Sequence, residues 1–205
     1  MKPAFFQLPA EKSAAVVDAA LAEFGANDFD TASLDRIVAA ARISKGGLYE
    51  YIASKDDLYL YCMRHAWASL YRYIESRVPA SGLPADILER FMCVSRIAIE
   101  WYLENPAMLG LLVRTARLPS ARLADEARAA FEHHFAGLFD ALDGARLAFA
   151  PQRLVELVKW QLAKTRHDAS QAIAAGRPAD AVRSAYLEQW AFFLSVLGQG
   201  IYRRD

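Results

Sequence analysis

The fold of this chain is decided by residues 33–55, which read SLDRIVAAARISKGGLYEYIASK. In the first half of this stretch, apolar residues recur at spacings of three and four, which predicts a short helix with one buried face. After room for only a tight turn, Ser44 stands where a second helix can be capped. Leu48 and Ile52 lie one turn apart in that second helix and can pack against the first. The sequence therefore predicts two short helices joined by a tight turn.

The other side chains of the second helix have the chemistry of a DNA contact. Lys45 can donate to a guanine edge or a phosphate, and the Gly46-Gly47 pair lets the backbone approach bases without a side chain between them. Tyr49 and Tyr51 offer hydroxyl donors for phosphate oxygens. Such a helix after a tight turn is typical of a helix-turn-helix, whose second helix enters the DNA major groove.

The segment from about Lys12 to Leu60 resembles the N-terminal domain of the TetR/AcrR family of bacterial transcriptional regulators. The resemblance rests on an apolar first helix from Val16 to Phe24, the helix that begins after Ser33, the run from Ile43 to Tyr51 and the continuation from Ser54 to Leu58. It implies a homodimer whose two recognition helices read a near-palindromic double-stranded DNA operator. It also implies a small molecule that binds in the C-terminal domain and changes the separation of those helices.

The resemblance assigns DNA-facing roles by position, and it assigns phosphate contacts alone to two arginines. The DNA-facing residues are Ser33, Lys45, Gly46, Gly47, Tyr49, Tyr51 and Lys55, and the two arginines are Arg36 and Arg42. The whole chain has a formal net charge of zero. Between Ser33 and Lys55, four basic residues stand against two acidic ones, so the local charge is 4 − 2 = +2. This favours binding through a local patch over nonspecific coating of DNA.

Three residues depart from the family pattern. Arg42 occupies the turn position where such proteins usually place glycine, so a left-handed backbone there costs more unless the turn is rearranged. Asp28 likewise replaces a usual glycine, although aspartate tolerates that conformation better than most residues. Glu50 puts a negative charge on the second helix, where it either accepts from a cytosine amine or faces solvent.

The sequence offers no sign of a catalytic, metal or cofactor site. No Ser/His/Asp set, paired-carboxylate site or phosphate-binding glycine loop can be assembled from it, so we expect a protein that is not an enzyme. The adjacent pair His133-His134 points in two directions on a helix and does not favour metal binding. The apolar run at the N-terminus is too short for a signal peptide. No window of the sequence has the ~18 apolar residues of a membrane span. We therefore expect a cytoplasmic protein with no membrane partner.

Beyond Leu60 the pattern stays helical to the end, so the chain is predicted to be all-α. We expect an N-terminal three-helix helix-turn-helix DNA-binding domain at residues 1–55 and a C-terminal helical domain for effector binding and dimerisation at residues 56–205. Arg114 or Arg117 could pair with an acidic group on an otherwise largely apolar effector. Large, adaptable side chains predicted to line an effector pocket are Phe91, Trp101, Tyr102, Met108, Leu112, Phe131 and Phe135.

The last two predicted helices, at about residues 151–175 and 179–203, are apolar on more than one face. Both apolar faces of such a helix must be buried. One face can pack on its own domain and the other on a symmetry mate, in a two-fold four-helix bundle. The alternative is a central core helix in a monomer. The residues predicted to form the dimer interface are Leu154, Leu157, Val158, Tyr186, Trp190, Phe193 and Leu197.

A second interpretation of the chain is a helical small-molecule-binding or protein-interaction module, in which the helix-turn-helix serves as a docking surface. Sequence-specific DNA binding requires a steep dependence on salt and a symmetric site, whereas docking requires neither. The resemblance favours a repressor that a small effector releases from its operator.

Overall fold

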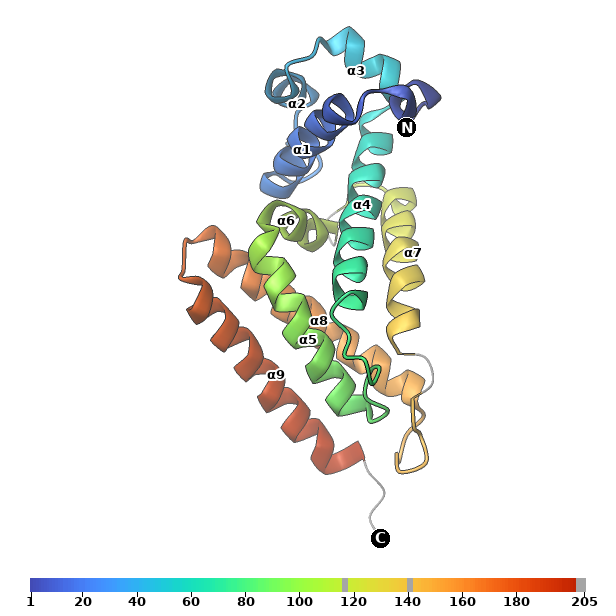
Figure 1. Cartoon of the computed structure of the whole chain (residues 1–205), viewed down its shortest axis with the longest axis vertical. Helices are drawn as coiled ribbons and strands as arrows, with labels where there is room; N and C mark the ends of the chain where they lie inside the picture. Colours follow the sequence, from blue (N-terminus) through green and yellow to red (C-terminus); the bar gives the residue numbers. More distant parts are fainter. Residues whose placement is uncertain (116–117, 140–141, 202–205) are drawn as a thin grey trace. The chain divides into compact units, whose positions relative to one another are not determined.

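A computed structural model of the chain describes residues 1–115, 118–139 and 142–201. These residues form one short 3-10 helix, η1, and nine α-helices, with no β-strand among them (Figure 1). None of these helices is long and apolar enough to cross a lipid bilayer. The predicted all-α class is confirmed. The elements are η1 (Pro3–Gln7), α1 (Ala10–Ala26), α2 (Leu34–Ala41), α3 (Lys45–Tyr51), α4 (Lys55–Glu75), α5 (Ile87–Glu104), α6 (Pro106–Arg114), α7 (Ala121–Leu138), α8 (Pro151–Ala174) and α9 (Ala179–Ile201).

The chain forms two compact units, each built from two separate segments. The first unit contains residues 1–69 and 107–132, and the second contains residues 70–106 and 133–205. The first unit therefore holds η1, α1, α2 and α3 together with most of α6 and α7, while α5, α8 and α9 lie in the second. The division at residue 55 stays a prediction, since compactness alone groups residues 56–69 with the first unit.

Apolar side chains from four helices form the core of the first unit. The Tyr59 ring lies edge-on to Phe24 and Phe29, with ring centroids 5.1 and 5.2 Å apart. Edge-to-face aromatic pairs add to the stabilisation from burial. Both predicted anchors of the second short helix are buried, and this confirms how α3 is oriented. The fully buried side chains include Ala20, Phe24, Ile37, Leu48, Ile52 and Leu58.

The carboxylate of Glu23 joins α1 to the start of α2. It is only 9% exposed and accepts a hydrogen bond from the Ser33 backbone N–H at 2.8 Å. The Arg36 Nε donates to both Glu23 oxygens at 3.0 and 2.9 Å, and Arg36 Nη2 donates to the Thr31 carbonyl at 2.8 Å. The hydrogen bond from Arg36 lowers the pKa of Glu23, because it stabilises the charged form. This network fixes where α2 begins relative to α1.

Two glycines bring the backbones of α1 and α6 into direct contact. A Cβ atom at Gly25 would lie 2.2 Å from the carbonyl oxygen of Ala107, and one at Gly110 would lie 2.4 Å from the carbonyl oxygen of Gly25. Side chains at these positions would force the two helices apart, so the crossing requires glycine. Arg114 completes the contact, since its Nη2 donates to the Ala26 carbonyl at 3.2 Å.

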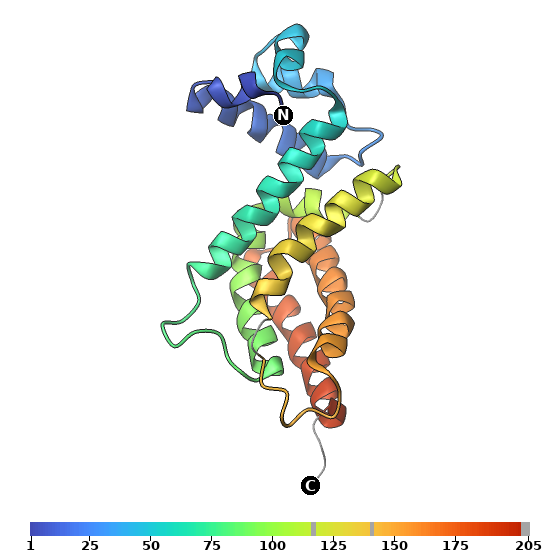
Figure 2. The ribbon, with the colours of Figure 1, turned by 90° about the vertical axis from the view of Figure 1, so that its right-hand side faces the viewer.

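In the second unit, α5, α8 and α9 run alongside one another (Figure 2). The Phe91 ring of α5 stacks with Phe139 and Trp190 at centroid distances of 4.3 and 6.2 Å. At the other end of α5, Glu100 accepts hydrogen bonds from the Arg183 Nε and Nη2 atoms at 2.6 and 2.8 Å. Aromatic stacking and an ion pair therefore hold α9 along the length of α5.

Arg42 ends α2 in the left-handed conformation, with φ 54° and ψ 41°. Its N–H donates to the Ala39 carbonyl, and the Ile43 N–H donates to the Val38 carbonyl, which is the Schellman pattern of helix termination. The turn is therefore not rearranged to suit arginine. In a residue with a Cβ atom, this backbone conformation has a steric cost of about 1–2 kcal/mol.

We expect Arg42→Gly to stabilise the protein by about 1 kcal/mol. Glycine removes the steric cost in the folded state, and the greater conformational entropy of glycine in the unfolded chain offsets only part of this gain. The measurement is the free energy of unfolding in urea. Arg42→Ala is the matched control, since it removes the same charged group and keeps the Cβ atom. Equal stability of the two variants would contradict the assignment of strain to Arg42.

Candidate DNA-binding interface

Helix α3 is held with one face inward and one face exposed. The Ser44 hydroxyl caps its first turn by accepting from the Gly47 N–H at 3.0 Å. Leu48 is fully buried and fixes the rotation of the helix about its axis. The exposed face therefore carries Lys45, Gly46, Tyr49 and Glu50. This is the surface that a docked DNA groove would meet first.

Of the two glycines of α3, Gly46 has no packing reason within the described part of the chain, whereas a Cβ atom at Gly47 would crowd the capping hydroxyl of Ser44. A Cβ atom at Gly46 would meet no atom within 4 Å, and one at Gly47 would meet only the Ser44 hydroxyl, at 3.1 Å. Glycine inside a helix costs about 0.5–1 kcal/mol relative to alanine. The fold does not need glycine at Gly46, and the missing side chain leaves room for the close approach of another molecule.

Lys45 already has an ionic partner on the neighbouring helix. Its Nζ lies 2.8 Å from the Asp35 carboxylate, and both side chains are exposed. The hydrogen bond to Asp35 raises the pKa of Lys45, so the amine stays charged. A phosphate or a guanine edge would have to replace the Asp35 carboxylate, which an exposed pair allows at little cost.

Three other predicted DNA contacts also have roles inside the unit. The Arg36 guanidinium binds Glu23 and Thr31, and the Ser33 hydroxyl accepts from two amides of the first turn of α2. The Lys55 amine lies 4.6 Å from the centroid of the Phe29 ring, and burial lowers its pKa. DNA contacts by these residues stay predictions, as they do for the exposed Arg42 and the half-buried Tyr51.

The N-terminal residues, which no pattern in the sequence linked to α3, also contact this helix. Lys2 donates from Nζ to the carbonyl oxygen of Tyr49 at 2.6 Å, although the two residues are 47 positions apart. The one local signal was Pro3, which is favoured at the first position of a helical turn and marks the start of η1.

The residues predicted to line a pocket are divided between the two units, and their grouping in one pocket stays a prediction. Phe91, Trp101, Tyr102 and Phe135 are buried in the second unit, whereas Met108, Leu112 and Phe131 belong to the first. Arg114 is engaged at the crossing of α1 and α6, with its Nε 3.5 Å from Asp28. Arg117 lies outside the described residues.

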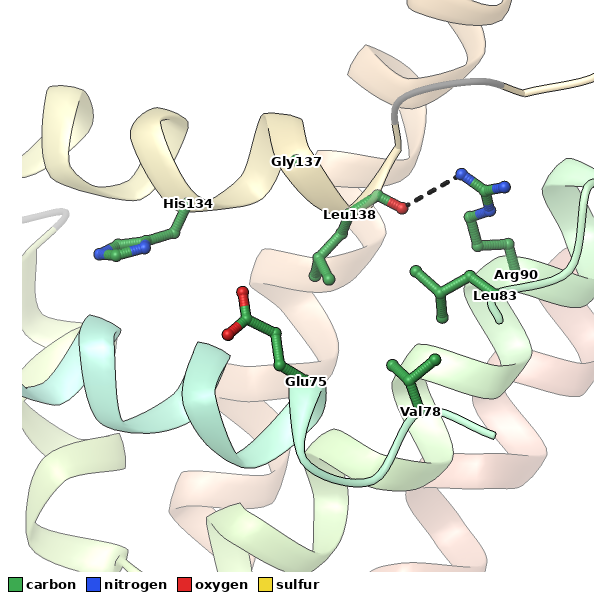
Figure 3. A pocket seen from close by; sticks show the side chains of 7 residues that line it. All are labelled: Glu75, Val78, Leu83, Arg90, His134, Gly137 and Leu138. Carbon is green, nitrogen blue, oxygen red and sulfur yellow. Dashed lines mark hydrogen bonds between the residues drawn. The ribbon is translucent and has the colours of Figure 1, made fainter. Parts of the chain in front are cut away.

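A cavity of about 400 Å³ opens in the second unit instead (Figure 3). Figure 3 shows Glu75 and His134 at one side of it and Arg90 at the other. The His134 ring stacks on Tyr71 at 5.0 Å, and burial lowers the pKa of His134. Arg90 donates to the Leu138 carbonyl at 3.4 Å. The cavity therefore combines polar groups at its ends with an apolar middle. Its lining is Glu75, Val78, Leu83, Arg90, His134, Gly137 and Leu138.

Helices α8 and α9 bury one apolar stripe and expose another. Four of the residues predicted for the dimer interface, Leu154, Val158, Tyr186 and Trp190, are buried in the protomer itself. Of the other three, Leu157 is exposed, and Phe193 and Leu197 are half-buried. The most exposed apolar residues of the two helices are Trp160 at 79% and Phe192 at 73%, followed by Val196 and Leu157. The apolar side chains that remain available to a partner therefore include Trp160 on α8 and Phe192 on α9.

A family model settles which family the helix-turn-helix segment belongs to. Residues 16–62 match the model described as bacterial regulatory proteins, tetR family. Residues 16–62 belong to the TetR family. This match includes α2, α3 and the start of α4.

Solved structures of TetR-type regulators share the fold of the whole chain. A TetR family transcriptional regulator from Chloroflexus aurantiacus is 20% identical, with a TM-score of 0.74 and 99% of each chain covered. FadR from Bacillus subtilis in complex with stearoyl-CoA is 12% identical, with a TM-score of 0.64 over 86% of this chain and 96% of that one. LfrR from Mycobacterium smegmatis in complex with proflavine is 19% identical, with a TM-score of 0.60 over 88% and 95%. A search of curated proteins finds no match.

We expect Gly46→Ala to weaken DNA binding by at least about tenfold while leaving the protein as stable as before or slightly more so. The added methyl group has free space in the protomer, improves helix propensity and obstructs only an approaching molecule. The measurements are the dissociation constant for an operator and the melting temperature. Gly137→Ala, which also adds a methyl group in open space on a helix, is the control and should leave DNA affinity unchanged.

Proposed function

We propose that this chain is a transcriptional repressor that binds a near-palindromic DNA operator as a homodimer and is released by a small, largely apolar effector. The observation that carries the proposal is the exposed face of α3, where a capped two-turn helix presents Lys45, Gly46 and Tyr49 outward. The TetR-family match of residues 16–62, which include α3, supports a role of this helix in DNA binding.

The contacts on DNA divide into base and phosphate contacts. Lys45 near the start of α3 is the candidate for reading a base, because the first residues of a recognition helix reach deepest into the major groove. Tyr49, Tyr51 and Lys55 offer hydroxyl and amine donors to phosphates on either side. With a net charge of zero, the protein gains affinity from these local contacts and little from long-range attraction.

A dimer supplies the second recognition helix that a specific site requires. Leu157 and Trp160 on α8 and Phe192 and Val196 on α9 form an exposed apolar surface on two helices that pack together. A second copy of the chain can cover this surface about a two-fold axis. Two α3 helices set ~34 Å apart would then read two half-sites on one face of the DNA.

The cavity lined by Glu75, Arg90 and His134 is our candidate effector site. Its volume of about 400 Å³ suits a small ligand, with Val78, Leu83 and Leu138 as apolar lining between Glu75 and Arg90. FadR and LfrR, which share the fold, were solved with stearoyl-CoA and proflavine, and this supports a ligand-binding role for this chain. Release would follow from tighter effector binding to the conformation that fits DNA less well.

The test is selection of bound duplexes from random DNA by the purified protein at physiological salt. The expected result is an enriched palindrome with half-sites about one helical turn apart. Phe192→Asp places a charge in the apolar surface and should give a folded monomer by sedimentation that no longer enriches the palindrome. Phe149→Asp is the control, because Phe149 is also exposed but lies outside α8 and α9.

Two results would contradict the proposed binding to an operator. No enrichment by a folded, dimeric protein would overturn the operator-binding proposal. Binding that is independent of salt would do the same, because phosphate contacts release counterions. Either result would favour the alternative function, a protein-interaction module in which α3 docks on a protein partner.

The enriched operator also provides the assay for effectors. We expect a compound that displaces the wild-type protein from the operator to be ineffective against Gly137→Leu, since the larger side chain on α7 occupies the cavity. Operator affinity without the compound should be unchanged. A compound that releases both proteins equally would exclude this cavity as its site.

A further inference from the structure

Residues 2–7 lie against the end of the recognition helix and outside the segment that matches the TetR family (Figure 1). The backbone N–H of Lys2 donates to the Tyr51 carbonyl at 2.7 Å, and Lys2 Nζ donates to the Tyr49 carbonyl at 2.6 Å. One residue thus binds the backbone of both tyrosines predicted to contact DNA.

These bonds serve carbonyls that the helix itself leaves without a partner. The last four carbonyls of an α-helix have no intrahelical donor. In α3, the N–H of the extended residue Ile52 donates to the Leu48 carbonyl at 3.1 Å, so one of these four carbonyls has a donor. Lys2 donates to two more of these carbonyls, those of Tyr49 and Tyr51. Its ammonium group also interacts favourably with the negative end of the helix dipole.

Phe5 attaches this segment to the rest of the unit. Its side chain is 3% exposed, and its ring centroid lies 6.4 Å from Tyr51 on α3 and 5.3 Å from Tyr61 on α4. The Phe5 N–H donates to the Lys2 carbonyl at 3.0 Å, so the buried ring also sets the position of Lys2. The segment is therefore a packed part of the unit with a defined register on α3.

We propose that residues 2–7 form a positioning arm for the recognition helix, in which Lys2 holds the last turn of α3 so that Tyr49 and Tyr51 face DNA in one fixed geometry. The inference rests on the proposed function for its consequence on DNA. Its first part, that Lys2 orders the last turn of α3, is a property of the free protein. Lys2 is a positioning residue here, because it acts through the backbone of the two tyrosines.

The first experiment measures amide hydrogen exchange in the full-length free protein. In Lys2→Met, exchange in the last turn of α3 and at Ile52 should be about tenfold faster, the factor that corresponds to 1.4 kcal/mol. Lys2→Arg, which can still donate to the Tyr49 carbonyl, should restore protection. Lys12→Met is the control for lost charge, since Lys12 is also exposed and lies on α1. Unchanged exchange in Lys2→Met would overturn the proposal.

The second experiment measures affinity for the selected operator as a function of salt. Positioning predicts that Lys2→Met weakens binding about tenfold with an unchanged salt slope, and that Lys2→Arg recovers the affinity. A direct phosphate contact by Lys2 would instead reduce the slope by about one, and this result would overturn positioning. Faster exchange with unchanged operator affinity would overturn the role in DNA binding. If the wild-type protein binds no DNA, the proposed function fails, and the exchange experiment alone decides whether Lys2 orders α3.

Discussion

A two-turn helix that contains two glycines cannot persist by itself in water, because so short a helix barely repays the cost of its first turn. The exposed face of α3, which we propose binds DNA, therefore depends on contacts that hold the helix from outside. Ser44 caps its start, Leu48 fixes its inner face in the core, and Lys2 binds carbonyls at its end. The geometry of this exposed face is a property of the whole unit, and the seven residues of α3 do not determine it alone.

Local signals in the sequence predicted the helices well, because a few neighbouring residues determine each of them. The caps at Ser33 and Ser44 and the spacing of apolar residues gave α2 and α3. Helices expected at about 151–175 and 179–203 are found at Pro151–Ala174 and, within the described residues, Ala179–Ile201. The sequence also marked Arg42 as the turn residue but left open whether the turn is rearranged, and the structure has the left-handed conformation there.

Contacts between distant positions could not be predicted in the same way. Glu23 and Arg36 are separated by 13 positions, and nothing in either local pattern shows that a buried carboxylate would engage this arginine. Helix α9 is apolar around most of its circumference, so periodicity could not tell the inward stripe with Trp190 from the outward one with Phe192. The aromatic residues expected in one pocket divide between two units for the same reason, since burial does not specify a neighbour.

The contact between Gly25 and Gly110 limits how this helix-turn-helix could be exchanged between proteins. A chimera that carried only residues 1–55 would leave behind the backbone of α6, against which the end of α1 rests. A new α6 with any larger residue in place of Gly110 would collide with the carbonyl of Gly25. The smallest transplantable part of this protein is thus discontinuous in sequence, and its two glycines would have to be inherited as a pair.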